Sequence, residues 1–198
     1  TIKDEGISGA VLEIYVNSVA YSAETFDYGN GYYNITVDCS DEDFWNYGAF
    51  TIDILVNKTY YVNDSVSYSF DITGLSASSI DSPADTDYNA DESFILVLNF
   101  TNSVNSSSPI LGASVEWKVG TDGTFTTTNV SFNSVSDKYE IEIWCNSPEF
   151  TGYGPFTIYI NLNKTYYQNS TETFSIHITG VSEAQIESPA DGQTYDSD

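Results

Sequence analysis

An internal repeat with a spacing of 106 residues constrains the fold of this chain more than any other feature. The sequence Asn-Lys-Thr-Tyr-Tyr occurs at 57–61 and again at 163–167. Three further pairs keep the same spacing: Ile72–Gly74 with Ile178–Gly180, Ser82–Asp85 with Ser188–Asp191, and Cys39 with Cys145. Gly9-Ala10 recurs as Gly112-Ala113, 103 residues later, so a three-residue length change lies between about residues 17 and 33. Because loops tolerate such changes, the repeat predicts two copies of one fold.

Each copy alternates apolar and polar residues with a period of two. In the first copy Phe50, Ile52 and Ile54 alternate with Thr51 and Asp53. The equivalent apolar residues of the second copy are Phe156, Ile158, Ile160 and Leu162. This period is typical of half-buried strands, and no segment has a convincing helical period. Strands separated by Gly, Asn, Asp and Ser turns over roughly 100 residues predict an antiparallel β-sandwich in each copy.

Four strand motifs resemble those of a known class of proteins. They are Gly-Ala-x-Val-x-aromatic at 112–117, Gly-x-Tyr-x-Ile-x-Val at 31–37, Gly-x-Phe-Thr-Ile-x-Ile at 48–54 and a closing Phe-x-Ile-x-Ile-Thr-Gly. Together they resemble the tandem immunoglobulin-like repeats of large prokaryotic, especially archaeal-type, cell-surface proteins. The resemblance covers nearly the whole chain. It implies an all-β chain of two tandem immunoglobulin-like antiparallel β-sandwiches, used as a stalk, surface-layer (S-layer), adhesion or extracellular-filament module.

The repeat also predicts the domain division. An apolar strand at 92–101, with Phe94, Leu96, Leu98 and Phe100 in phase, opens the second copy, and its first-copy counterpart would precede Thr1. Either the chain is a segment of a longer array, or another chain fills the uncovered edge. We therefore expect four parts: module 1 at 1–81, with its opening strand missing or supplied from elsewhere, an acidic linker at 82–91, module 2 at 92–185, and the start of a next linker at 186–198.

Charge and hydropathy exclude two classes of partner. The chain has 29 Asp and Glu against 5 Lys and no Arg, which gives a formal net charge of −24 at pH 7. A nucleic-acid surface is excluded, because neutralising phosphates requires clustered basic side chains. No apolar run approaches the ~20 residues of a membrane-spanning helix, so we expect no membrane span in this segment.

Eight Asn-x-Ser/Thr triplets are the strongest chemical signal. About four would arise by chance from this composition, and an Asn-, Ser- and Thr-rich surface makes some by accident. Their placement at strand ends, in loops or on outward strand positions permits glycosylation at all eight. The predicted acceptors are Asn34, Asn57, Asn63, Asn99, Asn105, Asn129, Asn163 and Asn169. Occupied acceptors would make this an extracellular glycoprotein.

Acidic residues in the predicted linker resemble part of a calcium-binding loop. Oxygen-bearing side chains recur at alternate positions, but the loop lacks the usual Gly at its sixth place and a distant bidentate Glu. A Ca²⁺ ion at the junction and a simply solvated acidic linker both remain open. The candidate ligands are Asp85, Asp87, Asn89, Asp91 and Glu92. We expect no other cofactor.

The single cysteine of each copy is expected to be a buried free thiol. Cys39 and Cys145 both share the inward phase of their strands, and a bond between two equivalent points of tandem modules would exceed the ~7 Å limit between Cα atoms. A disulfide to another molecule remains an alternative. His177 alternates with Ile176 and Ile178 and is expected to face outward, so no Cys–His catalytic pair is predicted.

These features favour a non-enzymatic, mechanical role at the cell surface, with identical chains as the expected partners and no catalytic residues. A carbohydrate- or cell-binding adhesin is the main alternative, because flat aromatic rings stack on sugars and exposed aromatic patches often mark binding sites. The aromatic side chains that support it are Tyr15, Trp45, Tyr47, Trp144 and Tyr159. An accessory module of a secreted enzyme is a third reading.

Overall fold

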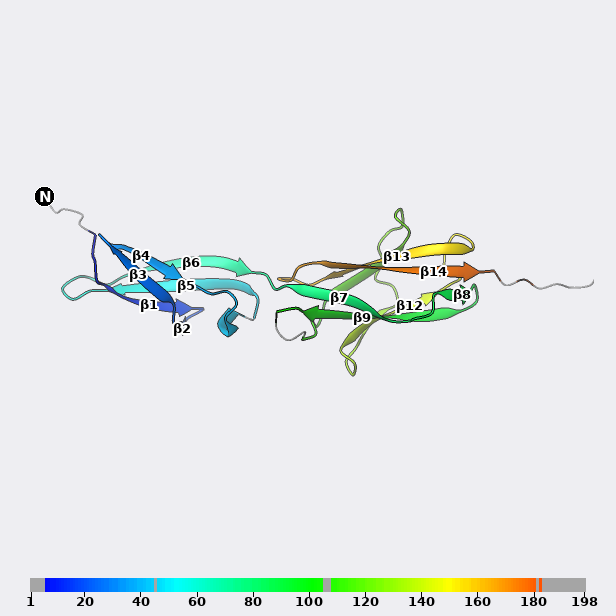
Figure 1. Cartoon of the computed structure of the whole chain (residues 1–198), viewed down its shortest axis with the longest axis horizontal. Helices are drawn as coiled ribbons and strands as arrows, with labels where there is room; N and C mark the ends of the chain where they lie inside the picture. Colours follow the sequence, from blue (N-terminus) through cyan, green and yellow to red (C-terminus); the bar gives the residue numbers. More distant parts are fainter. Residues whose placement is uncertain (1–5, 45, 105–107, 181, 183–198) are drawn as a thin grey trace, which may run out of the picture. The chain divides into compact units, whose positions relative to one another are not determined.

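The computed structural model describes residues 6–44, 46–104, 108–180 and 182. In that part of the chain every regular element is a strand except one 3₁₀ turn at Glu42–Phe44. The all-β prediction is therefore confirmed (Figure 1). Residue contacts divide the chain into two compact units. The first comprises Thr1–Ala77, Thr101–Ala113 and Asn163–Ser170, and the second comprises Ser78–Phe100, Ser114–Leu162 and Thr171–Asp198.

The strands of the second copy form two four-stranded sheets. One sheet has the order β11-β12-β9-β7 and the other β10-β13-β14-β8. If β7 to β14 are named A, A′, B, C, D, E, F and G in chain order, the two sheets are D-E-B-A and C-F-G-A′. This is the topology of an immunoglobulin-like sandwich, so that fold class is confirmed. The bounds are β7 Ser76–Ser82, β8 Asp87–Asn89, β9 Ser93–Asn102, β10 Ser114–Val119, β11 Val130–Asn133, β12 Lys138–Trp144, β13 Gly154–Asn163 and β14 Ser170–Thr179.

The segment expected to be an acidic linker at 82–91 belongs to the second unit instead. Strand β7 lies beside β9 in one sheet, and β8 pairs in parallel with His177–Thr179 of β14 in the other. The chain changes sheets at Pro83, between these two strands. The prediction missed this because short, polar edge strands have no strong period-two pattern. The predicted next linker at 186–198 lies outside the described residues.

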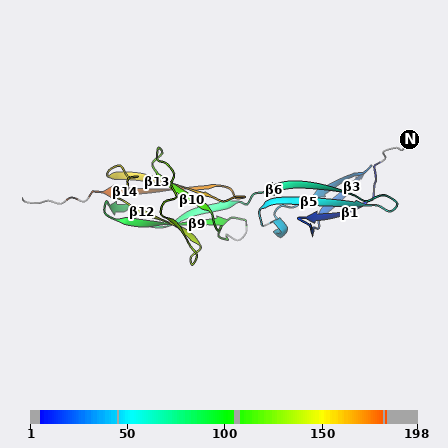
Figure 2. The ribbon, with the colours of Figure 1, turned by 180° about the vertical axis from the view of Figure 1, so that it is seen from behind.

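The first copy contains a four-stranded sheet of order β2-β1-β5-β6 and a separate β3-β4 hairpin. Strands β1, β5 and β6 lie side by side in both views of the molecule (Figures 1 and 2). The inward phase of β1 and β5 is as predicted, because Ile14, Val16, Phe50 and Ile52 are all buried. On β6 only Ile72 is buried, whereas Val66 and Tyr68 of the same phase are 57% and 67% exposed. The bounds are β1 Val11–Val16, β2 Val19–Ala20, β3 Glu24–Gly29, β4 Tyr32–Thr36, β5 Gly48–Asn57 and β6 Asp64–Ile72.

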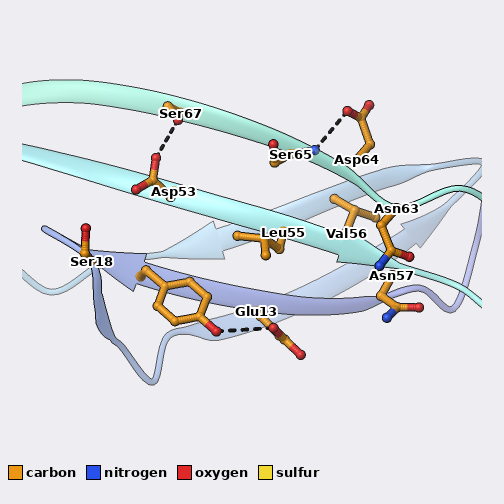
Figure 3. Close-up of a pocket in the computed structure, with 11 residues that line it drawn as sticks. Glu13, Ser18, Asp53, Leu55, Val56, Asn57, Asn63, Asp64, Ser65 and Ser67 are labelled. Atoms are coloured by element: carbon orange, nitrogen blue, oxygen red, sulfur yellow. Dashed lines mark hydrogen bonds between the residues drawn. The ribbon is translucent and has the colours of Figure 1, made fainter.

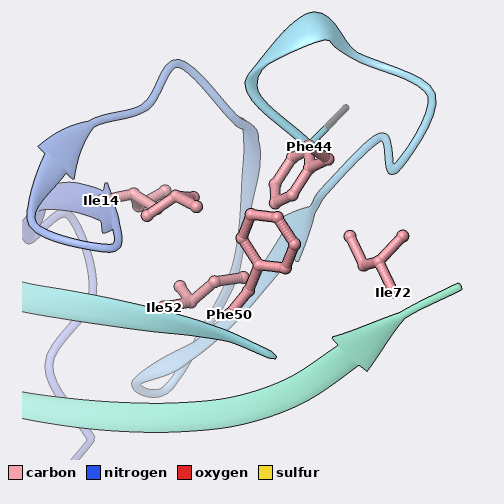
Figure 4. Close-up of a cluster of buried hydrophobic side chains, with 6 residues drawn as sticks. Ile14, Phe44, Phe50, Ile52 and Ile72 are labelled. Carbon is pink, nitrogen blue, oxygen red and sulfur yellow. The ribbon is translucent and has the colours of Figure 1, made fainter. Parts of the chain in front are cut away.

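Aromatic and branched side chains build the core of the first unit. Phe44 is fully buried and meets Phe50 and Tyr21 edge-on, with ring centroids 5.2 and 5.4 Å apart. Figure 4 shows Phe44 next to Phe50, with Ile14, Ile52 and Ile72 gathered around the same interior. Edge-to-face aromatic pairs add to the stabilisation that burial alone gives. The 3₁₀ turn thus places one large aromatic ring in the core.

Within each copy, the Asn-Lys-Thr-Tyr-Tyr motif contacts the Gly-Ala motif. In the first copy Lys58 Nζ donates a hydrogen bond of 2.7 Å to the carbonyl oxygen of Gly9, and in the second Lys164 Nζ donates one of 3.1 Å to Gly112. Both glycines have positive φ, +66° and +64°, which explains why glycine occupies them. The motifs recur because they fix the same turn-to-strand contact in each copy.

Candidate functional site

The predicted glycan acceptors lie mostly on the accessible surface. Of the seven described, six have exposed side chains: Asn34, Asn57, Asn63, Asn129, Asn163 and Asn169. Asn105 lies outside the described residues. A glycan is added to the side-chain amide nitrogen, so exposure of that group is the geometric requirement. The six exposed positions meet it.

Asn99 differs from the other acceptors. It points outward from β9 as expected, but its side chain is half-buried, and its Nδ2 donates to both carboxylate oxygens of Asp81 at 2.9 and 3.0 Å. Asp81 also forms an ion pair with Lys138. The atom that would receive a glycan is therefore held in a contact between β7 and β9, and modification there would remove one of its two N–H donors.

A shallow polar pocket lies on the outer face of the β1-β5-β6 sheet. It has a volume of about 560 Å³. Figure 3 shows Glu13 from β1, Asp53 and Leu55 from β5 and Ser67 from β6 along this face. Tyr15, one of the predicted sugar-stacking residues, lines the same pocket. In the register of β1 with β5, Tyr15 lies opposite Asp53 and Glu13 lies opposite Leu55.

The groups of this pocket are hydrogen-bonded to one another. The Tyr15 hydroxyl donates to Glu13 Oε2 at 3.3 Å, and the Ser67 hydroxyl donates to Asp53 Oδ1. The negative charge of Glu13 and this hydrogen bond raise the pKa of Tyr15 above its usual value, so the phenol remains a neutral donor. The ring can stack on a sugar face, and the carboxylates and hydroxyls beside it can accept hydrogen bonds from the hydroxyl groups of the sugar.

The prediction had missed Glu13, Asp53 and Ser67. Their outward phase on β1, β5 and β6 was visible in the sequence, and Glu13 is two residues from Tyr15 on the same strand, but only strand pairing brings Asp53 and Ser67 to this face beside them.

The other predicted aromatic residues do not join Tyr15 in one groove. Tyr47 is half-buried and packs against the core of the first unit. Within the second unit Trp144 belongs to β12 and Tyr159 to β13, which are strands of different sheets. Tyr159 lies 5.7 Å from the ammonium of Lys118, and Trp45 lies outside the described residues. The structure therefore provides no continuous aromatic platform within either described unit.

The acidic residues predicted as calcium ligands are exposed, but their oxygens serve the local backbone. Asp85 Oδ1 accepts from the Asp87 amide at 3.1 Å, and Glu92 Oε2 accepts from the Asn89 amide at 2.6 Å. Asn89 Oδ1 accepts from the Thr179 hydroxyl at 3.0 Å. Over the described residues, no group of three His, Cys, Asp or Glu side chains is placed to hold a metal ion. Asp91 is likewise exposed on the turn before β9.

The two cysteines occupy different environments, contrary to the expectation that both are buried. Cys145 is 3% exposed, and burial, with a smaller contribution from Glu92, raises the pKa of its thiol. Cys39 is exposed. The prediction was wrong for Cys39 because the strand that opens the second copy, β9, has no described counterpart over the first. His177 is exposed, as predicted.

No protein-family model matches the sequence, and no curated protein matches it either. Solved structures show a distant likeness. Titin Ig tandem domains A164-A165 are 12% identical, with 87% of this chain and 83% of that chain covered and a TM-score of 0.34. The titin I-band fragment I67-I69 is 10% identical, with 88% and 56% covered and a TM-score of 0.45. Tandem Ig repeats of Dlar are 10% identical, with 87% and 84% covered and a TM-score of 0.33. At this identity the likeness concerns the fold alone.

No described helix is long and apolar enough to cross a membrane.

Proposed function

We propose that this chain is a non-enzymatic structural part of an extracellular surface, a subunit of a filament, stalk or surface layer that assembles with identical chains. The observation that carries the proposal is the set of six exposed glycan acceptors, distributed over both copies of the repeat. An N-linked glycan is added outside the cytoplasm, and the proposal therefore places the chain there. The hydrogen-bonded ladders of both copies suit a load-bearing role.

Glycopeptide mass spectrometry of the protein isolated from its source tests this proposal. We expect glycans at most of the six exposed acceptors and the lowest occupancy at Asn99, whose amide nitrogen binds Asp81. Asn30 and Asn46 are exposed but are not followed by the acceptor pattern, so they serve as internal controls and should stay unmodified. Unmodified asparagine at every acceptor would overturn the extracellular assignment.

Electron microscopy of the same native material tests the assembly. Ordered filaments or lattices are the expected result, whereas dispersed single chains would contradict self-assembly. Imaging with and without EDTA distinguishes an acidic segment that binds Ca²⁺ from one that is simply solvated. Because Asp85, Asn89 and Glu92 already bind the local backbone or Thr179, we expect order to persist in EDTA.

The Tyr15 pocket supports a second candidate function, sugar binding. In a nuclear magnetic resonance titration with a panel of neutral oligosaccharides, shifts confined to β1, β5 and β6 are expected, with an affinity that falls at least tenfold in Tyr15→Ala. Tyr28→Ala is the matched control, because Tyr28 is an exposed aromatic residue that does not line this pocket. If no sugar shifts these strands, or if Tyr15→Ala binds as the parent does, the pocket is not a sugar site.

A further inference from the structure

An apolar groove on the first unit is the feature that the proposed function does not explain. It has a volume of about 360 Å³, and its lining contains no Asp, Glu, Lys, Arg or His. Two strands of one sheet and the β4 side of the hairpin supply its walls. The lining residues are Ile35, Val37, Cys39, Ile52, Ile54, Tyr68 and Phe70.

Each lining residue has a counterpart 106 residues later in the chain. The counterparts are Ile141, Ile143, Cys145, Ile158, Ile160, Phe174 and Ile176. Six of these seven are at most 3% exposed, and Phe174 is half-buried. The same seven positions therefore form a closed core in the second copy and an open groove in the first.

Strand β9 accounts for this difference. It pairs antiparallel with β12, with Leu96 opposite Ile141 and Phe94 opposite Ile143. Its alternate residues Phe94, Leu96, Leu98 and Phe100 are 6%, 0%, 0% and 1% exposed. The Phe94 ring lies 6.1 Å from that of Phe174. These side chains fill, in the second copy, the position that the groove occupies in the first.

The edge beside the groove is also available for pairing. In the described part of the chain β4 pairs only with β3, whereas its counterpart β12 pairs with both β11 and β9. An unpaired strand edge presents backbone N–H and C=O groups that bind an added strand. An apolar groove alongside such an edge gives the added strand a place for alternate side chains.

We propose that this groove binds an extended strand of a separate polypeptide, antiparallel to β4, with the chemistry of β9. The repeat defines that chemistry: β9 contains no ionisable side chain and is apolar at alternate positions. An acidic strand is disfavoured by the surroundings, since residues 6–77 hold ten Asp and Glu and one Lys. Strand β9 of a second molecule of this chain is not the donor, because β9 is already paired with β12 on one side and β7 on the other. This inference goes beyond the proposed function and does not depend on it.

The two cysteines provide the readout. Cys39 lines the groove and is exposed, whereas Cys145 is buried with a raised thiol pKa, so a thiol reagent should react with the two in separate fast and slow phases. The ligand is a synthetic peptide with the sequence of residues 93–102 and a short lysine tag for solubility. The control peptide carries the same tag and the changes Leu96→Asp and Leu98→Asp.

Saturating amounts of the first peptide are expected to slow the labelling of Cys39 at least tenfold and to leave Cys145 unchanged. The chain variant Tyr68→Lys should weaken this protection at least tenfold, because Tyr68 lines the groove. Tyr28→Lys is its matched control. Both tyrosines lie on strands and are 67% exposed, but Tyr28 is outside the groove, so Tyr28→Lys should bind the peptide as the parent does.

Four results would overturn the proposal. The peptide could leave Cys39 fully reactive, or the control peptide could protect it equally well, which would indicate unspecific adhesion. Cys39 could be protected in the chain alone at every concentration, which would mean that the chain closes its own groove. Protection that increases with chain concentration and accompanies dimer formation would mean that a second molecule of this chain occupies the groove instead.

Discussion

Phe44→Ala is expected to lower the free energy of unfolding of the first unit by about 3–5 kcal/mol, the usual cost of removing a fully buried phenylalanine. The ring is completely buried and contacts Tyr21 and Phe50 edge-on, so its loss leaves a cavity that the surrounding side chains fill only in part. Since small domains have a total stability of about 5–15 kcal/mol, a large share of the stability of this unit would be lost.

Urea denaturation followed by near-ultraviolet circular dichroism measures this loss, and thiol labelling of Cys145 monitors the second unit in the same samples. Tyr32→Ala is the control. Tyr32 is 73% exposed on β4, so we expect this substitution to cost at most about 0.5 kcal/mol. A Phe44→Ala chain as stable as the Tyr32→Ala chain would show that the 3₁₀ turn does not hold the core together.

Ile141→Ala and Ile35→Ala should have very different effects although the two residues occupy the same place in the repeat. Ile141 is 0% exposed and lies opposite Leu96 of β9 in the same sheet, so its truncation is expected to cost about 2–5 kcal/mol. Ile35 is half-buried at the open groove, and its truncation removes fewer contacts, so we expect a loss of about 1 kcal/mol or less.

The same denaturation experiment compares the two variants. Ile141→Ala should shift the transition that exposes Cys145, and Ile35→Ala should leave that transition in place. Equal losses in the two units would contradict the difference in burial, and would mean that Ile35 is covered in solution as fully as Ile141 is.

Much of the fold was predictable because alternation and repetition are local properties of the sequence. Phe50, Ile52, Ile158 and Ile160 point inward as their phase predicts, since neighbouring side chains of a strand face opposite sides of a sheet. The repeat then transfers the assignment from one copy to the other. The A and A′ strands β7 and β8 escaped prediction because polar residues in a short edge strand look like those of a linker.

The candidate sites were less predictable because they depend on pairing between distant strands. Phase alone places Cys39 inward, as it does Cys145, but exposure depends on whether another strand lies over the residue. The same reason separates Asn99 from the other glycan acceptors, since the carboxylate that binds its amide belongs to a strand 18 residues earlier. Tyr15 acquires its neighbour Asp53 in the same way, through the pairing of β1 with β5.

The short parallel contact between β8 and β14 has a consequence for the second unit under tension. The Thr86 carbonyl accepts from the His177 amide at 2.7 Å, and the Thr179 carbonyl accepts from the Ala90 amide at 2.9 Å. Because the strands are parallel, a pull on the chain before β8 and after β14 slides one strand along the other. The bonds between them then carry the force simultaneously, so they must break together and cannot open one at a time from an end.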